Sequence, residues 1–174
     1  MNAETFNSFF WVIFIFAAVQ AAYRSFFYEA DRRFLLYFGM ARPQDLILGK
    51  ILYNFIYLLV IGVVSLIFFQ FLLGDQLNDP LAFVVLIAIA ALGFSAILTL
   101  VAGLSAKAGN NPALPAILSI PLLYPQVTTL SRVSVRALTG FSWQVNGHLL
   151  IVLALIAIVS LLLSYLLFAY LWRD

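Results

Sequence analysis

Long apolar runs dominate this sequence, and short polar stretches separate them. Each run is long enough, or nearly so, to cross about 30 Å of hydrocarbon at about 1.5 Å per helical residue. The runs are continuous, whereas barrel strands would alternate apolar and polar residues over about ten positions. The pattern therefore predicts an all-α integral membrane protein: a polytopic helix bundle that forms one transmembrane domain over residues 1–174. Its five predicted transmembrane helices cover residues 6–23, 51–73, 81–104, 113–130 and 149–172.

The composition supports a membrane protein. Hydrophobic residues make up 65% of the chain and charged residues 9%, against about 25% charged residues in an average soluble domain. The net charge of +2 does not indicate nucleic-acid binding, because the basic residues fall in the polar stretches between the spans. The absence of cysteine excludes disulfides and thiolate metal sites.

The distribution of basic residues predicts an orientation. Seven of the nine lysines and arginines fall in residues 24–50, at Lys107 and at Arg173, and the positive-inside rule places these segments in the cytoplasm. Arg132 and Arg136 then lie outside, in an external segment over residues 131–148. The N-terminus is predicted outside and the C-terminus inside.

The connector over residues 24–50 is charged and partly amphipathic. Apolar residues recur on one helical face, with Glu29, Arg32 and Arg33 on the other. Pro43 ends this helix and suits the first position of the next, where Asp45 is favourably placed near the N-terminus. Two interpretations remain open: an anchor on the membrane surface, or a cytoplasmic docking surface for a partner. Under the second hypothesis the contact residues are Glu29, Asp31, Arg32, Arg33, Arg42 and Lys107.

Polar residues inside the spans point to packing rather than to ion transport. No charged residue lies in a span interior, which argues against an ion-coupled carrier or a channel. Asn54 and Gln70 are expected to form interhelical hydrogen bonds. Small residues recur every fourth position of the third span, a pattern that allows close helix packing within the bundle or, alternatively, in a dimer; they are Ala91, Ser95, Thr99 and Gly103.

The fourth predicted span contains three prolines. Pro115, Pro121 and Pro125 each remove a backbone donor and disturb the preceding turn. The span is therefore expected either to line a pathway and flex or to be a static kinked helix.

No enzyme motif is present. The sequence contains no G-x-S-x-G, H-E-x-x-H or G-x-x-x-x-G-K-[ST] pattern, so any ATP hydrolysis is expected in a partner chain. The single histidine, His148, is interpreted as an interfacial polar residue, with axial ligation of a haem iron as the less favoured alternative. No cofactor or metal site is assigned to this chain.

Several segments taken in order resemble the cytochrome c maturation protein B family, the membrane subunits of an ABC-type haem exporter. They are RSFFYE, LILGKILYNF, LGFSAILTLVAGLSAKAGNNPALPAILSIPLLYP and the C-terminal LFAYLWRD. The resemblance implies an ABC-2-type permease fold in the bacterial cytoplasmic (inner) membrane. It also implies partners: an ABC ATPase subunit, a haem-handling membrane subunit and a second copy of the chain. Haem would be a cargo of the whole complex.

The chain departs from this family at its beginning. Family members have a basic segment and one further span before the equivalent of Phe6, and the five predicted spans would match the family's last five. We therefore expect this chain alone to insert poorly unless another span is supplied. Alternative functions are an ABC-2-type permease for a glycan, a lipid or a drug, or a passive membrane scaffold.

Overall fold

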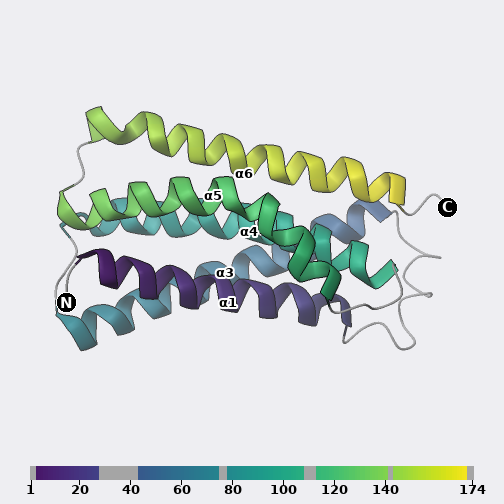
Figure 1. Cartoon of the computed structure of the whole chain (residues 1–174), viewed down its shortest axis with the longest axis horizontal. Coiled ribbons are helices and arrows are strands. Elements are labelled where there is room, and N and C mark those ends of the chain that lie inside the picture. The colour runs from purple at the N-terminus through teal and green to yellow at the C-terminus, as the bar shows by residue number, and fades with distance from the viewer. Residues whose placement is uncertain (1–2, 28–42, 75–77, 108–112, 141–142, 172–174) are drawn as a thin grey trace.

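The described residues form a bundle of five long helices (Figure 1). The computed structural model describes residues 3–27, 43–74, 78–107, 113–140 and 143–171. The helices keep the labels of Figure 1: α1 (Ala3–Phe27), α3 (Pro43–Leu73), α4 (Pro80–Lys107), α5 (Ala113–Thr139) and α6 (Trp143–Leu171).

Helix α4 is the centre of the bundle. It contacts all four other helices, and those four also contact one another in the order α1, α3, α6, α5 and back to α1. The physical reason is its small-residue ridge: Ala91, Ser95 and Thr99 are buried, as is Gly103, so neighbouring backbones approach closely. The prediction that this ridge packs within the bundle is confirmed.

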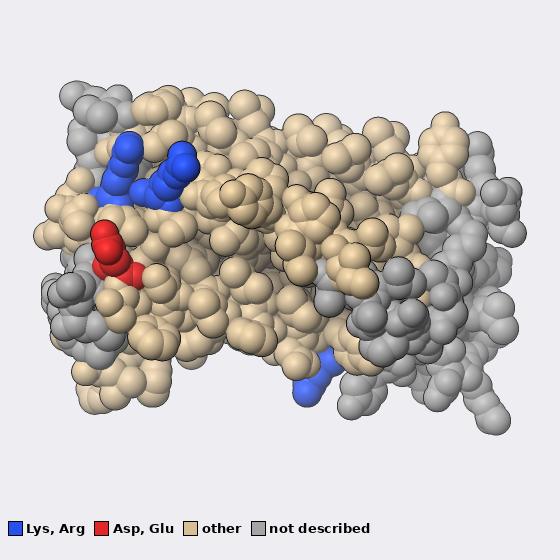
Figure 2. Space-filling model, in the orientation of Figure 1, with Lys and Arg blue, Asp and Glu red and all other residues tan. Residues whose placement is uncertain are grey.

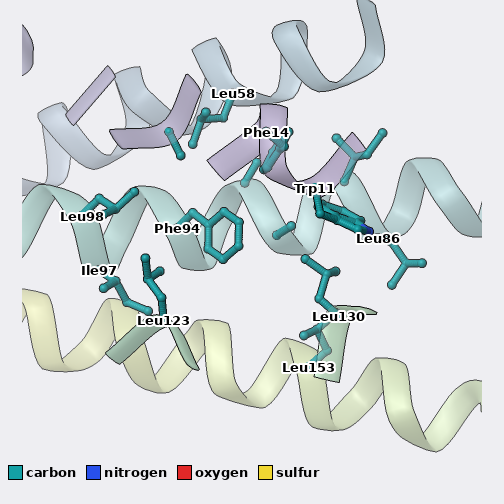
Figure 3. Close-up of a cluster of buried hydrophobic side chains, with 14 of the residues drawn as sticks. Trp11, Phe14, Leu58, Leu86, Phe94, Ile97, Leu98, Leu123, Leu130 and Leu153 are labelled. Carbon is teal, nitrogen blue, oxygen red and sulfur yellow. The ribbon is translucent and has the colours of Figure 1, made fainter. Parts of the chain in front are cut away.

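Buried side chains of α1, α3, α5 and α6 pack against those of α4 (Figure 3). Trp11 and Phe14 come from α1 and Leu58 from α3, while Leu130 and Leu153 come from α5 and α6. Large residues on the outward faces of α3 and α6 are exposed instead, as expected for helices that contact lipid. In the described part of the chain, the arrangement of the helices is thus set by their packing against one central helix, α4.

Aromatic residues fill the space between α1, α3 and α4. Phe10 lies with its ring centroid 5.1 Å from that of Phe83 and 5.9 Å from that of Phe69, both in edge-to-face geometry. Phe6 contacts the same two rings. Such pairs add to burial because the positive ring edge meets the negative ring face.

Among the described residues, four helices are long and apolar enough to cross a membrane: α1, α3, α4 and α6. They match four of the five predicted spans. Helix α5 is not among them, because prolines, hydroxyl residues and two arginines interrupt its apolar character. It also continues past residue 130 to Thr139, and α6 begins at Trp143. Most of the predicted external segment, residues 131–148, is therefore helical.

Helix α3 begins at Pro43 with Asp45 in its first turn, as the sequence predicts. Pro fits this position because the N–H of a first helical residue has no intrahelical partner. The predicted interhelical bond of Asn54 is also confirmed: its Nδ2 donates to Thr99 Oγ1 at 2.8 Å. Gln70 is half-buried and makes no hydrogen bond within the described residues.

Candidate functional site

The predicted docking residues lie mostly outside the described ranges. This applies to Glu29, Asp31, Arg32, Arg33 and Arg42, whereas Lys107 is the last residue of α4. The helix ends that border these segments are described. The end of α1, the start of α3, the end of α4 and the start of α5 lie at the same end of the bundle as the C-terminus (Figure 1).

An apolar groove of about 510 Å³ opens between α1, α4 and the N-terminal half of α5, towards this same end. Its volume falls within the range of about 300–1,000 Å³ that is typical of ligand pockets. Phe16 and Ile120 on its rim are 67% and 68% exposed, so the groove opens sideways, where lipid would surround the bundle. The floor and walls are formed mainly by Ile15, Val19, Ala22, Leu98, Ala102 and Leu123.

One wall of this groove is formed by the part of α5 that contains the predicted prolines. Pro121 and Pro125 lie inside α5 and are exposed. Ser119 and Ile120, which line the groove, come just before Pro121, and Leu123, which also lines it, lies between the two prolines. Neither proline can donate to the preceding turn, so two backbone bonds are missing from this stretch. The axis of α5 changes direction about midway along the helix (Figure 1), as a proline kink explains. Pro115 lies in the first turn.

The C-terminal half of α5 is held to α1 by a polar cluster of Asn7, Trp11, Ser131 and Ser134, of which only Ser131 is exposed. Trp11 Nε1 donates to Asn7 Oδ1 and to Ser134 Oγ, both at 2.9 Å. Ser134 Oγ donates to Asn7 Oδ1, and Asn7 Nδ2 donates to the Ser131 carbonyl at 3.4 Å. Asn7, Trp11 and Ser134 are nearly inaccessible, so these bonds form without competition from solvent and fix α5 against α1.

Two contacts hold the far end of α5 to the α3–α4 connection. Asn78 Nδ2 donates to the Leu138 carbonyl at 2.6 Å, and the Asp79 backbone N–H donates to the Ala137 carbonyl at 3.4 Å. These bonds place the last turn of α5 level with the first turn of α4.

Gln126 fixes α5 on α4 next to the proline segment. It is fully buried, and its Nε2 donates to the Ala90 carbonyl at 3.4 Å. Its Oε1 has no partner among the described residues. The side chain occupies the space above Gly93, where an added Cβ would lie 2.0 Å from Gln126 Nε2. The absence of a side chain at Gly93 is what lets Gln126 pack here.

Helix α5 therefore has two unequal halves. Its C-terminal half is held by the polar cluster, by the α3–α4 connection and by Gln126, whereas its N-terminal half is the groove wall and exposes several large apolar residues, among them Ile117, Ile120 and Tyr124. The two prolines lie between them. The kink therefore separates a half of α5 that polar contacts fix in place from a half without such contacts among those described above.

The sequence predicted that prolines disturb this helix, but it predicted neither the groove nor the polar cluster. Asn7 and Trp11 are four residues apart, a spacing that places them on one helical face and could have indicated a shared contact. Their partner Ser134 is 123 residues from Trp11, and no sequence pattern links the two. His148 is exposed near the start of α6, and the described residues contain no cluster of metal-binding side chains.

Comparison with known proteins adds no assignment. No protein-family model matches the chain, and neither the curated proteins nor the solved structures give a match.

Proposed function

We propose that this chain is the transmembrane subunit of an ABC-type transporter of the haem-exporter class, which acts in cytochrome c maturation. It is a non-catalytic membrane subunit, and a partner chain binds and hydrolyses ATP. The observation that carries the proposal is the common end of the bundle at which the charged connector joins α1 and α3, with Lys107 at the end of α4 there as well. The resemblance to cytochrome c maturation protein B gives that end its proposed partner, the ATPase.

The proposed mechanism uses the two halves of α5. An ATPase that contacts residues 24–50 and Lys107 would push on the helix ends nearest the groove. Since the C-terminal half of α5 is held by Ser134 and Gln126, the displacement would be taken up at Pro121 and Pro125. The groove would then widen or close during the ATPase cycle, and this couples hydrolysis to release of a haem-loaded carrier at the outer face.

In this proposal the other partners are a haem-handling membrane subunit and a second copy of the chain, in the bacterial cytoplasmic membrane. The N-terminus lies outside and the C-terminus inside. This chain binds no cofactor, and haem is a cargo of the complex. The ABC-2-type permease fold belongs to the same proposal, supported by the all-helical bundle and the resemblance.

One observation favours a second candidate, an ABC-2-type permease for a lipid or a lipid-linked glycan. The groove is almost wholly apolar and opens sideways, which suits a hydrocarbon chain entering from the bilayer. A hydrophobic drug would fit the same groove. A passive scaffold would need neither the groove nor an ATPase.

The proposal is tested by purifying the chain with an affinity tag from native membranes under mild conditions and identifying its partners. An ATPase carrying a nucleotide-binding P-loop, together with other cytochrome c maturation proteins, is the expected result. An ATPase accompanied by glycan or lipid enzymes would favour the second candidate. Purification without any ATPase would leave the scaffold as the better account.

A further inference from the structure

Two arginines stand out on the surface of α5. Arg132 and Arg136 are both exposed. They lie four residues apart, so they are neighbours on one face of the helix. Figure 2 shows two basic side chains next to each other near one end of the bundle, with an acidic side chain close by and uncharged residues elsewhere around them. The other basic residues whose side chains are described lie towards the opposite end of the bundle: Arg24 in the last turn of α1, and Lys50 about two turns from the start of α3.

The depth of this pair follows from the contacts at the end of α5. The Asp79 N–H bonds the Ala137 carbonyl, so Arg136 lies level with the first turn of α4. Arg132 lies one turn, about 6 Å, deeper along the helix. Helix α4 has 28 residues and is therefore about 42 Å long, the thickness of a bilayer including its headgroups. Both arginines then lie at the level of the headgroups rather than in the hydrocarbon.

The two guanidinium groups have unequal surroundings. Arg136 Nη1 donates to Asn146 Oδ1 at 2.6 Å, which orients one side of this guanidinium and leaves further donors. Arg132 has no hydrogen bond or ion pair within the described part of the chain. Position in the last turn of α5 explains Arg136, since its charge interacts favourably with the helix dipole. Arg132, one turn further in, has no such role.

Neither arginine forms an ion pair with an acid of the described residues. Asp79 Oδ1 accepts the backbone N–H of Ala82 at 3.0 Å, so this carboxylate caps the start of α4. Thr128 and Thr129 donate their hydroxyls to carbonyls of their own helix. They are therefore satisfied and tolerate contact with lipid. The face around the arginines thus combines two positive charges with side chains that need no partner.

We propose that Arg132 and Arg136 form a binding site for the phosphate headgroup of an anionic phospholipid. Charge complementarity and depth carry the inference: arginine pairs bind phosphate through several parallel N–H donors, and basic residues near a membrane surface attract anionic lipid. A headgroup bound here contacts the held half of α5 and stabilises it against α4 and α6.

Native mass spectrometry of the intact chain in detergent tests the site, with phosphatidylglycerol and phosphatidylcholine added in turn. Phosphatidylglycerol should be retained preferentially, and each of Arg132→Gln and Arg136→Gln should weaken its binding about fivefold. Arg24→Gln, which removes an exposed charge near the other end of the bundle, serves as the matched control and should leave binding unchanged.

Further arms separate other ligands. Soluble glycerol phosphate should bind far more weakly than the lipid, and equal binding would indicate a site for free phosphate instead. The proposal is overturned if the double variant retains phosphatidylglycerol like the unaltered chain. It is equally overturned if the variant loses a dimer without any change in lipid binding, since the arginines would then contact a protein.

Discussion

Replacing Gly93 tests how α5 is held on α4. A methyl group at this position would lie 2.0 Å from Gln126 Nε2 and 2.5 Å from Gln126 Cδ. Ordinary contact begins near 3.4 Å, so Gln126 must move by more than 1 Å or α5 must shift. Overpacking of a closed interior typically costs about 1–3 kcal/mol. We expect Gly93→Ala to lower the free energy of unfolding by that amount.

Gly49→Ala is the matched control. Gly49 is also helical, and an added Cβ there meets nothing within 4 Å. Alanine costs less conformational entropy than glycine in a helix, so this substitution should raise stability by up to about 1 kcal/mol. The two substitutions are chemically identical and are predicted to act in opposite directions.

The assay is unfolding in mixed micelles with increasing sodium dodecyl sulfate, followed by circular dichroism. Gln126→Ala should rescue Gly93→Ala, with a coupling energy of about 1–3 kcal/mol in the double-mutant cycle. Two results would contradict the packing of Gln126 over Gly93. One is that Gly93→Ala is as stable as Gly49→Ala, and the other is that the effects of Gly93→Ala and Gln126→Ala on stability are additive.

Three further predictions follow the same reasoning. Asn7→Leu should destabilise the chain by about 1–3 kcal/mol in the same unfolding assay, because it removes the hydrogen bonds that Trp11, Ser131 and Ser134 make to Asn7; Ser160→Ala, whose hydroxyl bonds the Ile156 carbonyl of its own helix, should cost less than about 0.5 kcal/mol, and equal losses would contradict the cluster's role. A cysteine at Gln76 should react with an impermeant thiol reagent from outside the cell and one at Arg33 should not, whereas the reverse labelling would overturn the orientation. Ala102→Phe should fill the groove and reduce cytochrome c assembly in cells at a normal membrane level of the protein, while unchanged assembly would separate the groove from function.

The sequence predicted the helices whose apolar runs are uninterrupted. Even the start of α3 at Pro43 was predictable, because proline and Asp45 both favour the first turn of a helix. Helix α5 was harder, since Arg132 and Arg136 interrupt the apolar pattern that defines a span although the helix itself continues to Thr139.

The candidate site was less predictable than the fold. Asn54 was expected to bond another helix, but its partner Thr99 depends on how α3 and α4 are rotated against each other. The groove depends in the same way on the packing of three helices, and so does the burial of Gln126 over Gly93. Such features arise between segments distant in sequence, where periodicity carries no information about the partner.

The central claim is that the end of the bundle carrying residues 24–50 and Lys107 couples to a partner ATPase. The most direct measurement is ATP hydrolysis by the purified complex with Arg32→Glu and Arg33→Glu, compared with Glu4→Arg near the opposite end of the bundle. The account predicts that the double charge reversal releases the ATPase or abolishes its stimulation, while Glu4→Arg changes neither. Normal hydrolysis and normal co-purification of the Arg32→Glu, Arg33→Glu variant would contradict it.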